Sequence, residues 1–243
     1  MKVVADLHNH SCLSPCASLE LSPSVLARLA RARGVELLAL TDHNSARNAP
    51  AFADACLREG VAPLFGMEAM SSEEAHLVCL FGEPEAALAF SSWIRERLPP
   101  VPNDPERFGD QIVVDADENI EDEEGIWLGS ALPLPFSELC DETNARGGLA
   151  IPAHIDRTVY GIIAQLGFLP DGPYAAVEAV RPLPPGAARN YTVITGSDAH
   201  YPEHVGRRPF GVDLPPDWKR ADGTARLDLL RSALADGRVT LPW

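Results

Sequence analysis

The sequence predicts an α/β fold in which parallel strands alternate with helices. Short runs rich in β-branched residues or leucine recur along the 243 residues, and amphipathic segments of helical period lie between them. Alternation of this kind builds a parallel sheet, because the helix between two strands returns the chain to the edge where the next strand begins. The pattern leaves two architectures open, an open sheet and a closed barrel.

Seven runs are expected to form the strands, and most of them end in a polar side chain. They are residues 2–8 (KVVADLH), 36–43 (ELLALTDH), 62–70 (APLFGMEAM), 75–82 (AHLVCLFG), 148–154 (GLAIPAH), 175–180 (AAVEAV) and 191–200 (YTVITGSDAH).

Helices are expected in the segments between these strands. Ser22 and Pro23 are typical of an N-cap and a first helical turn, and the helix that they begin is expected to end at Gly34. Further helices are expected over residues 46–59, 84–97, 136–147 and 225–236. The apolar stretch that follows His154 has a helical pattern at its centre, and it is expected either to pack on the sheet or to line a pocket.

Residues 99–130 interrupt the alternation. Three prolines fall within four residues at the start, and a dense acidic stretch follows over residues 115–124. This pattern predicts two short strands joined by a charged turn, which we interpret as a surface insertion within a single domain of residues 1–243. The acidic side chains could trap a metal ion, but acidic loops are more often simply solvated.

Composition limits the classes of partner. The formal net charge is −15, and no block of lysine and arginine stands out, so a long nucleic acid is not expected. A small phosphate ester stays compatible with this charge, because bound metal ions would dominate the local field. No apolar run approaches the roughly 20 residues of a membrane span, and the five cysteines follow no secretory pattern. We therefore expect a cytoplasmic protein with reduced thiols and no membrane partner; no protein partner is indicated.

Potential metal ligands are concentrated at the strand ends. His8 and His10 stand two residues apart, so on a strand both imidazoles would point to one side. Six of the seven histidines fall at such positions, together with two carboxylates: His8, His10, His43, Glu68, His76, His154, Asp198 and His200. The carboxyl ends of parallel strands converge in space, so this pattern predicts a site for more than one metal ion.

Four spaced motifs and one strand-end glutamate resemble a known family. DLHNHS (6–11), TDHN (41–44), Glu68, PAH (152–154) and GSDAH (196–200) occur in the order found in the polymerase and histidinol phosphatase (PHP) family. The resemblance implies a distorted TIM-like barrel of seven strands and helices, (β/α)7, that holds two or three divalent ions, Zn, Fe or Mn. Known activities of this family include phosphomonoesterases, nucleotide phosphatases and exonucleases.

The resemblance also assigns ligands to each ion. It implies a first metal held by His8, His10, Glu68 and Asp198, a second held by Glu68, His76 and His154, and a third held by His43 and His200. The third ion also needs a ligand from the turn after His10, where the family usually has a histidine or aspartate and this chain has Ser14-Pro15-Cys16. Either Cys16 replaces that ligand as a thiolate, which would favour zinc or iron, or it only shapes the turn of a two-metal site.

Other side chains near the motifs are expected to support the ligands or the substrate. Asp42 and Asp6 are candidates for fixing the orientation of a ligand imidazole. Glu178 could face the site or form an ion pair elsewhere in the barrel. Arginine binds phosphate through its planar fork, and the candidates for that role are Arg157, Arg47, and Arg207 or its neighbour Arg208.

We expect a metal-dependent phosphoesterase that hydrolyses a small phosphate ester, either a phosphomonoester or a nucleotide, including a short oligonucleotide. A metal-activated water near Glu68 would attack phosphorus, and His200, Asp198 or solvent would protonate the leaving group. Two alternatives remain. An amidohydrolase-like C–N hydrolase would need a lysine to bridge its metals, and the only lysines, Lys2 and Lys219, lie far from the motifs. A non-catalytic metal-binding or regulatory module would bind metal without turnover.

Overall fold

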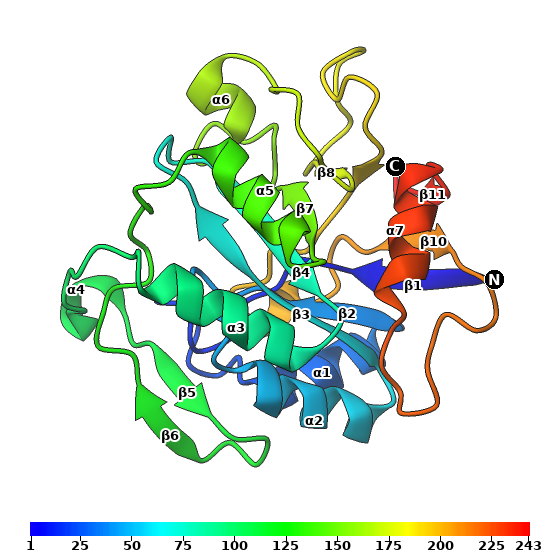
Figure 1. The fold of residues 1–243 in the computed structure, drawn as a ribbon. Helices are drawn as coiled ribbons and strands as arrows, with labels where there is room; N and C mark the ends of the chain where they lie inside the picture. Colours follow the sequence, from blue (N-terminus) through cyan, green and yellow to red (C-terminus); the bar gives the residue numbers. More distant parts are fainter.

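The strands form a curled sheet around an α/β barrel-like core (Figure 1). The computed structural model describes residues 1–243. Seven strands are hydrogen-bonded in the order β11–β10–β1–β2–β3–β4–β7. Their bounds are β1 (Lys2–Asp6), β2 (Leu37–Leu40), β3 (Ala62–Met70), β4 (His76–Phe81), β7 (Leu149–Pro152), β10 (Phe210–Asp213) and β11 (Val239–Thr240).

A pair of short parallel strands lies between β7, at one edge of this sheet, and the end of β1. These strands are β8 (Val177–Glu178) and β9 (Val193–Ile194). Ala175 N–H, just before β8, donates to the carbonyl of Ala150 in β7 at 2.9 Å. His10 N–H, just after β1, donates to the carbonyl of Ala199, which follows β9, also at 2.9 Å. These hydrogen bonds continue the curl of the sheet around the core, as a distorted TIM-like barrel requires.

The strand directions correct one prediction. β1, β2 and β3 are parallel, as expected, but β4 runs antiparallel to both β3 and β7. Only residues 71–75 separate β3 from β4. A parallel crossover needs a dozen or more residues, so this short connection can only form a hairpin. The sequence analysis also did not anticipate β10, which pairs antiparallel with β1.

The longer helices fall where the sequence predicts them. They are α1 (Pro23–Ala32), α2 (Ala49–Glu59), α3 (Pro84–Arg95), α5 (Phe136–Ala145) and α7 (Leu227–Ala235). The Ser22 side chain accepts a hydrogen bond from Val25 N–H, so it is the predicted N-cap of α1. Figure 1 shows α1 and α2 side by side below the strands. Two short helices, α4 (Pro105–Phe108) and α6 (Ile162–Leu166), lie in the connections. None of the helices combines the length and the hydrophobicity that a membrane span requires.

Alternation along β3 separates two apolar layers. Phe65 and Met67 belong to a cluster of 38 buried residues that includes the packed faces of α1, α2 and α3. Leu64 points to the other side and joins a second cluster, of 22 buried residues, to which α7 also contributes. Successive side chains of a strand point to opposite faces, so Glu68 shares the inner face with Leu64. The glutamate is thereby directed into the barrel.

The acidic segment contains the expected hairpin, formed by β5 (Ile112–Val114) and β6 (Ile120–Glu123) paired antiparallel. Asn48, the residue before α2, is fully buried beneath it. Its side-chain amide donates to the carbonyl of Ile112 and accepts from Val114 N–H, at 3.2 and 3.0 Å. Asn48 therefore fastens the hairpin to the barrel, while every residue of β6 is exposed.

Replacing Asn48 with alanine is expected to destabilise the fold by about 2–3 kcal/mol, because a buried amide that pairs with two backbone groups is lost. Urea unfolding followed by circular dichroism would measure this loss. Arg58→Ala is the matched control, because Arg58 contacts the same hairpin from the surface, through an exposed ion pair with Asp117 and a hydrogen bond to the Ala116 carbonyl. Its loss should cost less than about 1 kcal/mol. Equal losses in the two variants would contradict this role of Asn48.

Candidate metal centre

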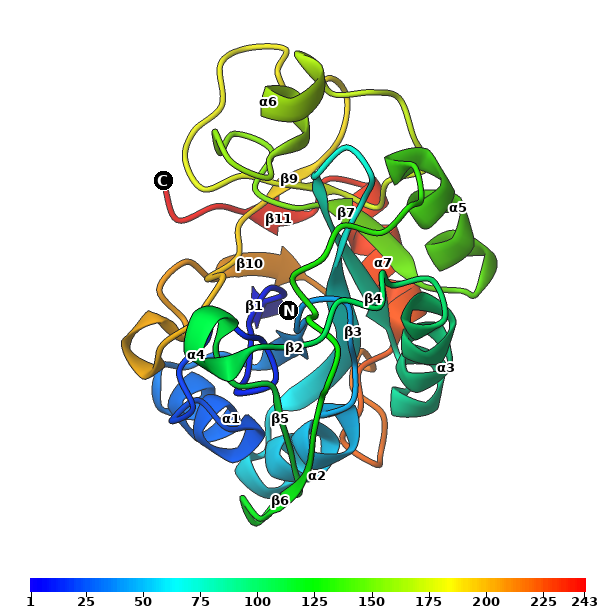
Figure 2. The same ribbon diagram turned by 90° about the vertical axis from the view of Figure 1, so that its left-hand side faces the viewer.

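The predicted ligands come together in the barrel although they are spread over almost 200 residues of the chain. His8 and His10 follow β1, His43 follows β2, and Glu68 lies within β3. His76 begins β4, His154 follows β7, and Asp198 and His200 follow β9. In Figure 1 β1 runs from the N-terminus at the right towards the left, and Figure 2 looks onto that left-hand side.

The Glu68 carboxylate is the centre of the cluster. Five imidazole nitrogens lie within 3.4 Å of its two oxygens, and they belong to His8, His10, His43, His76 and His154. The shortest of these distances is 2.8 Å, from Oε1 of Glu68 to Nδ1 of His76. A carboxylate has about four acceptor positions, so five imidazoles around one carboxylate exceed what hydrogen bonding alone requires.

Asp198 is the second carboxylate of the cluster. Its Oδ1 lies 3.3 Å from Nε2 of His10 and 3.6 Å from Nε2 of His8. The same oxygen is 3.4 Å from Nδ1 of His200. Its Oδ2 accepts a hydrogen bond from the Arg157 guanidinium at 2.6 Å. Asp198 therefore connects the buried histidines to a cation at the entrance of the site.

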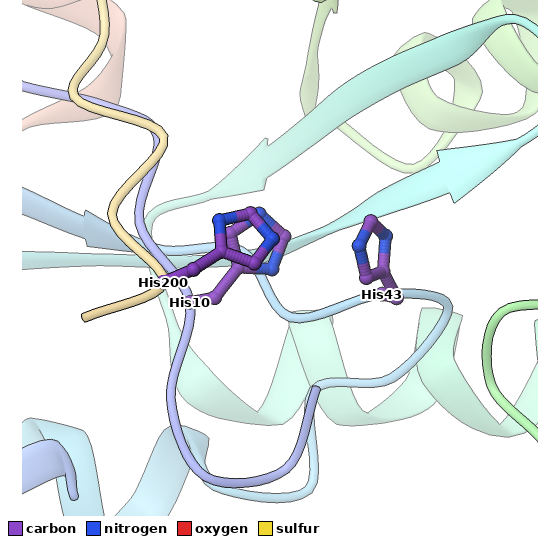
Figure 3. A group of neighbouring side chains, drawn as sticks. All are labelled: His10, His43 and His200. Atoms are coloured by element: carbon purple, nitrogen blue, oxygen red, sulfur yellow. The ribbon is translucent and has the colours of Figure 1, made fainter. Parts of the chain in front are cut away.

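Three overlapping groups of side chains have ligand atoms close enough together to share an ion. They are His8, His10, Glu68 and Asp198; His43, Glu68 and His76; and His10, His43 and His200. The first group is the one predicted for the first metal. Figure 3 shows the imidazoles of His10 and His200 one over the other, with His43 beside them; the ring centres of His10 lie 4.1 and 4.6 Å from those of His200 and His43.

The second and third groups differ from those that the resemblance implies. His43 takes part in the group around Glu68 and His76, whereas His154 contacts Glu68 without joining a group. His10 completes the third group in the place expected for the turn ligand. Both differences arise because the imidazoles crowd around one carboxylate, so a given ring lies close to more than one ion position.

Backbone strain accompanies two members of the cluster. His154 and Asp198 have φ angles of 29° and 47°, in the left-handed region that residues with a β-carbon rarely adopt. Such conformations cost of the order of 1–3 kcal/mol and persist where the surroundings enforce them. The strain turns both side chains toward Glu68 at the ends of their strands.

The charge states of the metal-free cluster follow from burial and from the close contacts. Burial opposes charge on His8, but Glu178, Glu68 and Asp198 outweigh it and hold the pKa of His8 well above its usual value. Burial likewise opposes charge on Glu68, but His76 and His8 keep its pKa well below the usual range. Burial and the neighbouring His200 lower the pKa of His10 to about 3. A divalent ion at His8 would therefore displace a proton that now compensates the carboxylates.

Further buried groups orient the ligands. Nδ1 of His8 lies 2.8 Å from Oε2 of Glu178, so Glu178 faces the site, one of the two expected outcomes. Nδ1 of His10 pairs with Ser14 Oγ at 2.9 Å, and that hydroxyl donates to Asp42 at 2.7 Å. Asp42 thus orients His10 through Ser14, a residue that the sequence analysis did not single out. Polar partners of this kind fix the tautomer of a metal-binding imidazole.

Asp6 has a different role from the one considered for it. Its carboxylate accepts hydrogen bonds from Ser197 N–H and Gly206 N–H, at 2.9 and 3.2 Å. These contacts hold the backbone on either side of Asp198 and His200, and they do not reach an imidazole ring. Asp6 therefore positions the segment that carries the last two ligands.

The donor set fits divalent metal ions. Nε2 of His76 and Nδ1 of His154 are buried without a hydrogen-bond partner, and Nδ1 of His76 and Nδ1 of His43 contact only the Glu68 carboxylate, without hydrogen-bond geometry. The Nε2 atoms of His8 and His10 face each other at 3.3 Å. Buried polar atoms are normally paired, so convergent and unpaired imidazole nitrogens fit a site that binds a cation. Imidazole and carboxylate together suit Zn, Fe or Mn.

Cys16 lies beside the cluster and belongs to none of the three groups. It lines a cavity together with His43 and His76. Although the residue is exposed at the surface, desolvation by the atoms around its thiol, with Glu68 and Asp198 nearby, raises the pKa of that thiol to about 12. Without a metal ion the thiol is therefore protonated at neutral pH.

The candidate phosphate-binding arginines have different surroundings. Arg157 is 42 % exposed and contacts Asp198 at the edge of the cluster. Arg207 donates to the carbonyls of Ser197 and Asp198, so it supports the ligand segment from behind. The guanidinium of Arg47 pairs with Asp122 and Glu124 of the acidic segment, at 2.6 and 3.4 Å. The structure thus brings Arg157 to the cluster and places Arg47 against the hairpin.

The fold and the cluster together define a barrel-like α/β protein with a buried histidine and carboxylate cluster that could hold metal ions. Residues 6–92 match the family model of the PHP domain. The family resemblance seen in the sequence is thereby confirmed for this part of the chain, which contains five of the eight clustered side chains. No curated protein matches the chain in sequence.

Solved structures share the fold over nearly the whole chain. The lesion-specific endonuclease EndoQ from Pyrococcus furiosus is 17 % identical, with a TM-score of 0.67. The alignment covers 99 % of the present chain but only 58 % of the endonuclease chain. A candidate metal-dependent phosphoesterase from Bifidobacterium adolescentis is 18 % identical with a TM-score of 0.56, covering 96 % of both chains. An amidohydrolase from Chromobacterium violaceum, solved with sulfate, is 22 % identical with a TM-score of 0.53, covering 98 % of both chains.

Removing divalent ions with a chelator is expected to lower the melting temperature, because an ion that binds only the folded state stabilises it. An ion at about 1,000 times its dissociation constant contributes about 4 kcal/mol. Calorimetry before and after chelation, and after adding back Zn²⁺ or Mn²⁺, measures the effect. Glu68→Ala is the control and should respond much less. An unchanged melting temperature in the unmodified protein would contradict the metal centre.

Glu178→Gln is expected to weaken metal binding by about 10-fold to 100-fold, because it removes the anionic partner that orients His8. Competition with a fluorescent chelator would measure the affinity. Glu121→Gln makes the same chemical change on the exposed strand β6 and should leave the affinity unchanged. If both variants bind metal as well as the unmodified protein, Glu178 does not orient a ligand.

Proposed function

We propose that this protein is a metal-dependent phosphoesterase that hydrolyses a small phosphate ester. The observation that carries the proposal is the convergence of five imidazoles and Asp198 on Glu68. The match of residues 6–92 to the PHP domain adds support. Bound ions would supply Lewis-acid activation of the phosphoryl group and a water of lowered pKa.

The chain's own residues have separable roles in this proposal. Glu68 and Asp198 hold the ions, and Glu178 and Ser14 keep His8 and His10 in the required orientation. Arg157, half exposed at the edge of the cluster, is placed to pair with a phosphate oxygen through its planar fork. His200 is the most exposed of the clustered histidines, with 20 % of its side chain exposed, and in a two-metal site, where it holds no ion, it is the proposed proton donor to the leaving group.

A small ester fits this chain better than a long nucleic acid. The structurally similar endonuclease was solved in complex with a 27-mer duplex containing an abasic lesion, but this chain covers only 58 % of that chain. The net charge of −15 and the exposed acidic strand β6 would repel a polyanion. We therefore keep a phosphomonoester or nucleotide as the proposed substrate and a short oligonucleotide as the upper limit.

Two alternatives are less well supported. An amidohydrolase-like reaction has one structural relative in its favour. However, Lys219 Nζ donates to the carbonyl of Gly60 and Lys2 lies at the start of β1, so neither lysine is at the cluster. A non-catalytic metal-binding module would not require a partly exposed arginine, Arg157, beside Asp198.

The decisive experiment compares a chromogenic phosphomonoester with a diester, using protein loaded with Zn²⁺, Fe²⁺ or Mn²⁺. Glu68→Ala is expected to abolish turnover. Arg157→Ala is expected to lower kcat/KM by about 10-fold to 100-fold, because a charge-assisted hydrogen bond is worth about 1.5–3 kcal/mol. Arg181→Ala is the control, because Arg181 is 69 % exposed and pairs with Asp156.

Each of the other outcomes would favour a different function for this protein. Metal binding without turnover of either ester would favour the non-catalytic module. Cleavage of an abasic duplex together with inactivity on small esters would move the proposal to a nuclease. Hydrolysis of an amide substrate in place of both esters would favour the C–N hydrolase.

A further inference from the structure

A cavity of about 250 Å³ lies directly beside the metal centre. His43 and His76 of the cluster form part of its lining, together with Met70. The other large side chains around it are three aromatic ones, Phe108, Trp127 and Tyr160, and the cationic Arg107. Pockets for whole drug-sized ligands usually measure about 300–1,000 Å³. This cavity is therefore of the size for one ring system next to the reacting centre.

The aromatic side chains present flat faces. The rings of Phe108 and Trp127 are stacked with centres 4.4 Å apart and an angle of 17° between their planes. Tyr160 is stacked on the ligand imidazole of His76, with centres 4.5 Å apart and an angle of 6°. Tyr160 is nevertheless 37 % exposed. Exposed aromatic surface beside a polar centre is typical of a binding site.

Backbone features hold these rings in place. A Cβ atom at Gly129 would lie 2.7 Å from the Trp127 ring, so only glycine allows the indole to lie against this segment. Tyr160 has a φ of 62°, and its carbonyl accepts a hydrogen bond from His76 N–H at 3.0 Å. A tyrosine held in this strained conformation over a metal ligand is pre-organised, which suggests a functional role.

We propose that this cavity binds a planar aromatic group of the phosphate ester, such as a nucleobase, while the ester phosphate lies at the metal centre. The inference rests on the proposed phosphoesterase function and names its substrate class. Flat aromatic walls favour a planar ring over a sugar or an alkyl chain, because stacking contributes beyond the apolar area that it buries. A cavity formed by chance would not need a strained tyrosine and a glycine to shape two of its walls.

The first test compares esters that differ only in the aromatic group. Adenosine 5′-monophosphate is paired with ribose 5-phosphate, and phenethyl phosphate is paired with butyl phosphate, with phosphate release as the readout. The aromatic ester of at least one pair is expected to have a kcat/KM about 10-fold to 100-fold higher, the range that stacking of one base supplies. A preference in the first pair alone identifies a nucleobase, and a preference in both pairs identifies any aromatic ring.

Variants connect this preference to the cavity. Trp127→Ala and Tyr160→Ala are expected to remove most of the preference, and Trp127→Phe to keep most of it. Phe168→Ala is the control, because Phe168 is an exposed aromatic residue that does not line the cavity. If neither aromatic ester is preferred, or if Trp127→Ala and Phe168→Ala behave alike, the inference is wrong.

A binding readout separates this inference from the proposed function. Adenosine and adenosine 5′-monophosphate are expected to quench the tryptophan fluorescence of the metal-loaded protein, and Trp127→Phe should remove most of the quenching. Turnover of ribose 5-phosphate without quenching by either ligand would leave the phosphoesterase proposal standing and reject the aromatic subsite. Quenching without turnover of any ester would support the cavity and reject the phosphoesterase proposal.

Discussion

Electrostatic compensation of one buried carboxylate is the constraint on which the site depends. Glu68 lies on the inner face of β3, 1 % exposed, where an isolated charge would be very costly. Four strand ends supply the five imidazoles that surround it, so the geometry of the barrel and the charge balance of the cluster cannot change independently. The strained backbones at His154 and Asp198 show that local conformation yields to this requirement. The apolar layers on both faces of β3 in turn fix where the carboxylate points.

The order of elements could be predicted from the sequence because each strand is an apolar run and each long helix has a clear start. Ser22 and Pro23, for example, locate the start of α1 to the residue. The direction of each strand was harder to predict. Alternating strands and helices indicate a parallel sheet, but β4 runs antiparallel to β3. The short link of residues 71–75 carried the missing information, because its length excludes a crossover. The strands β10 (FGVD) and β11 (VT) contain glycine, aspartate and threonine, so neither is a continuous apolar run.

The side chains of the cluster were predictable because histidine and acidic side chains at the ends of apolar runs form a pattern in one dimension. Their grouping was not, because it depends on side-chain directions within the curled sheet. Ser14 was missed for a related reason: a serine in a turn is common, and only the folded chain shows its hydroxyl between His10 and Asp42. Phe108 and Trp127 were overlooked because the acidic residues dominate the segment in which they lie.

The gradient of burial across the cluster has a consequence for how metal ions enter and leave. The position bounded by His8, His10, Glu68 and Asp198 is almost sealed, whereas the side chains of His43 and His200 are 10 % and 20 % exposed. An ion held by His43 and His200 would therefore be the first in contact with solvent, and it would stand in front of the sealed position. Ions at the two positions should then exchange on very different timescales. The identity of the inner ion would reflect the metals available while the protein folds, and that of the outer ion the metals available at any later time.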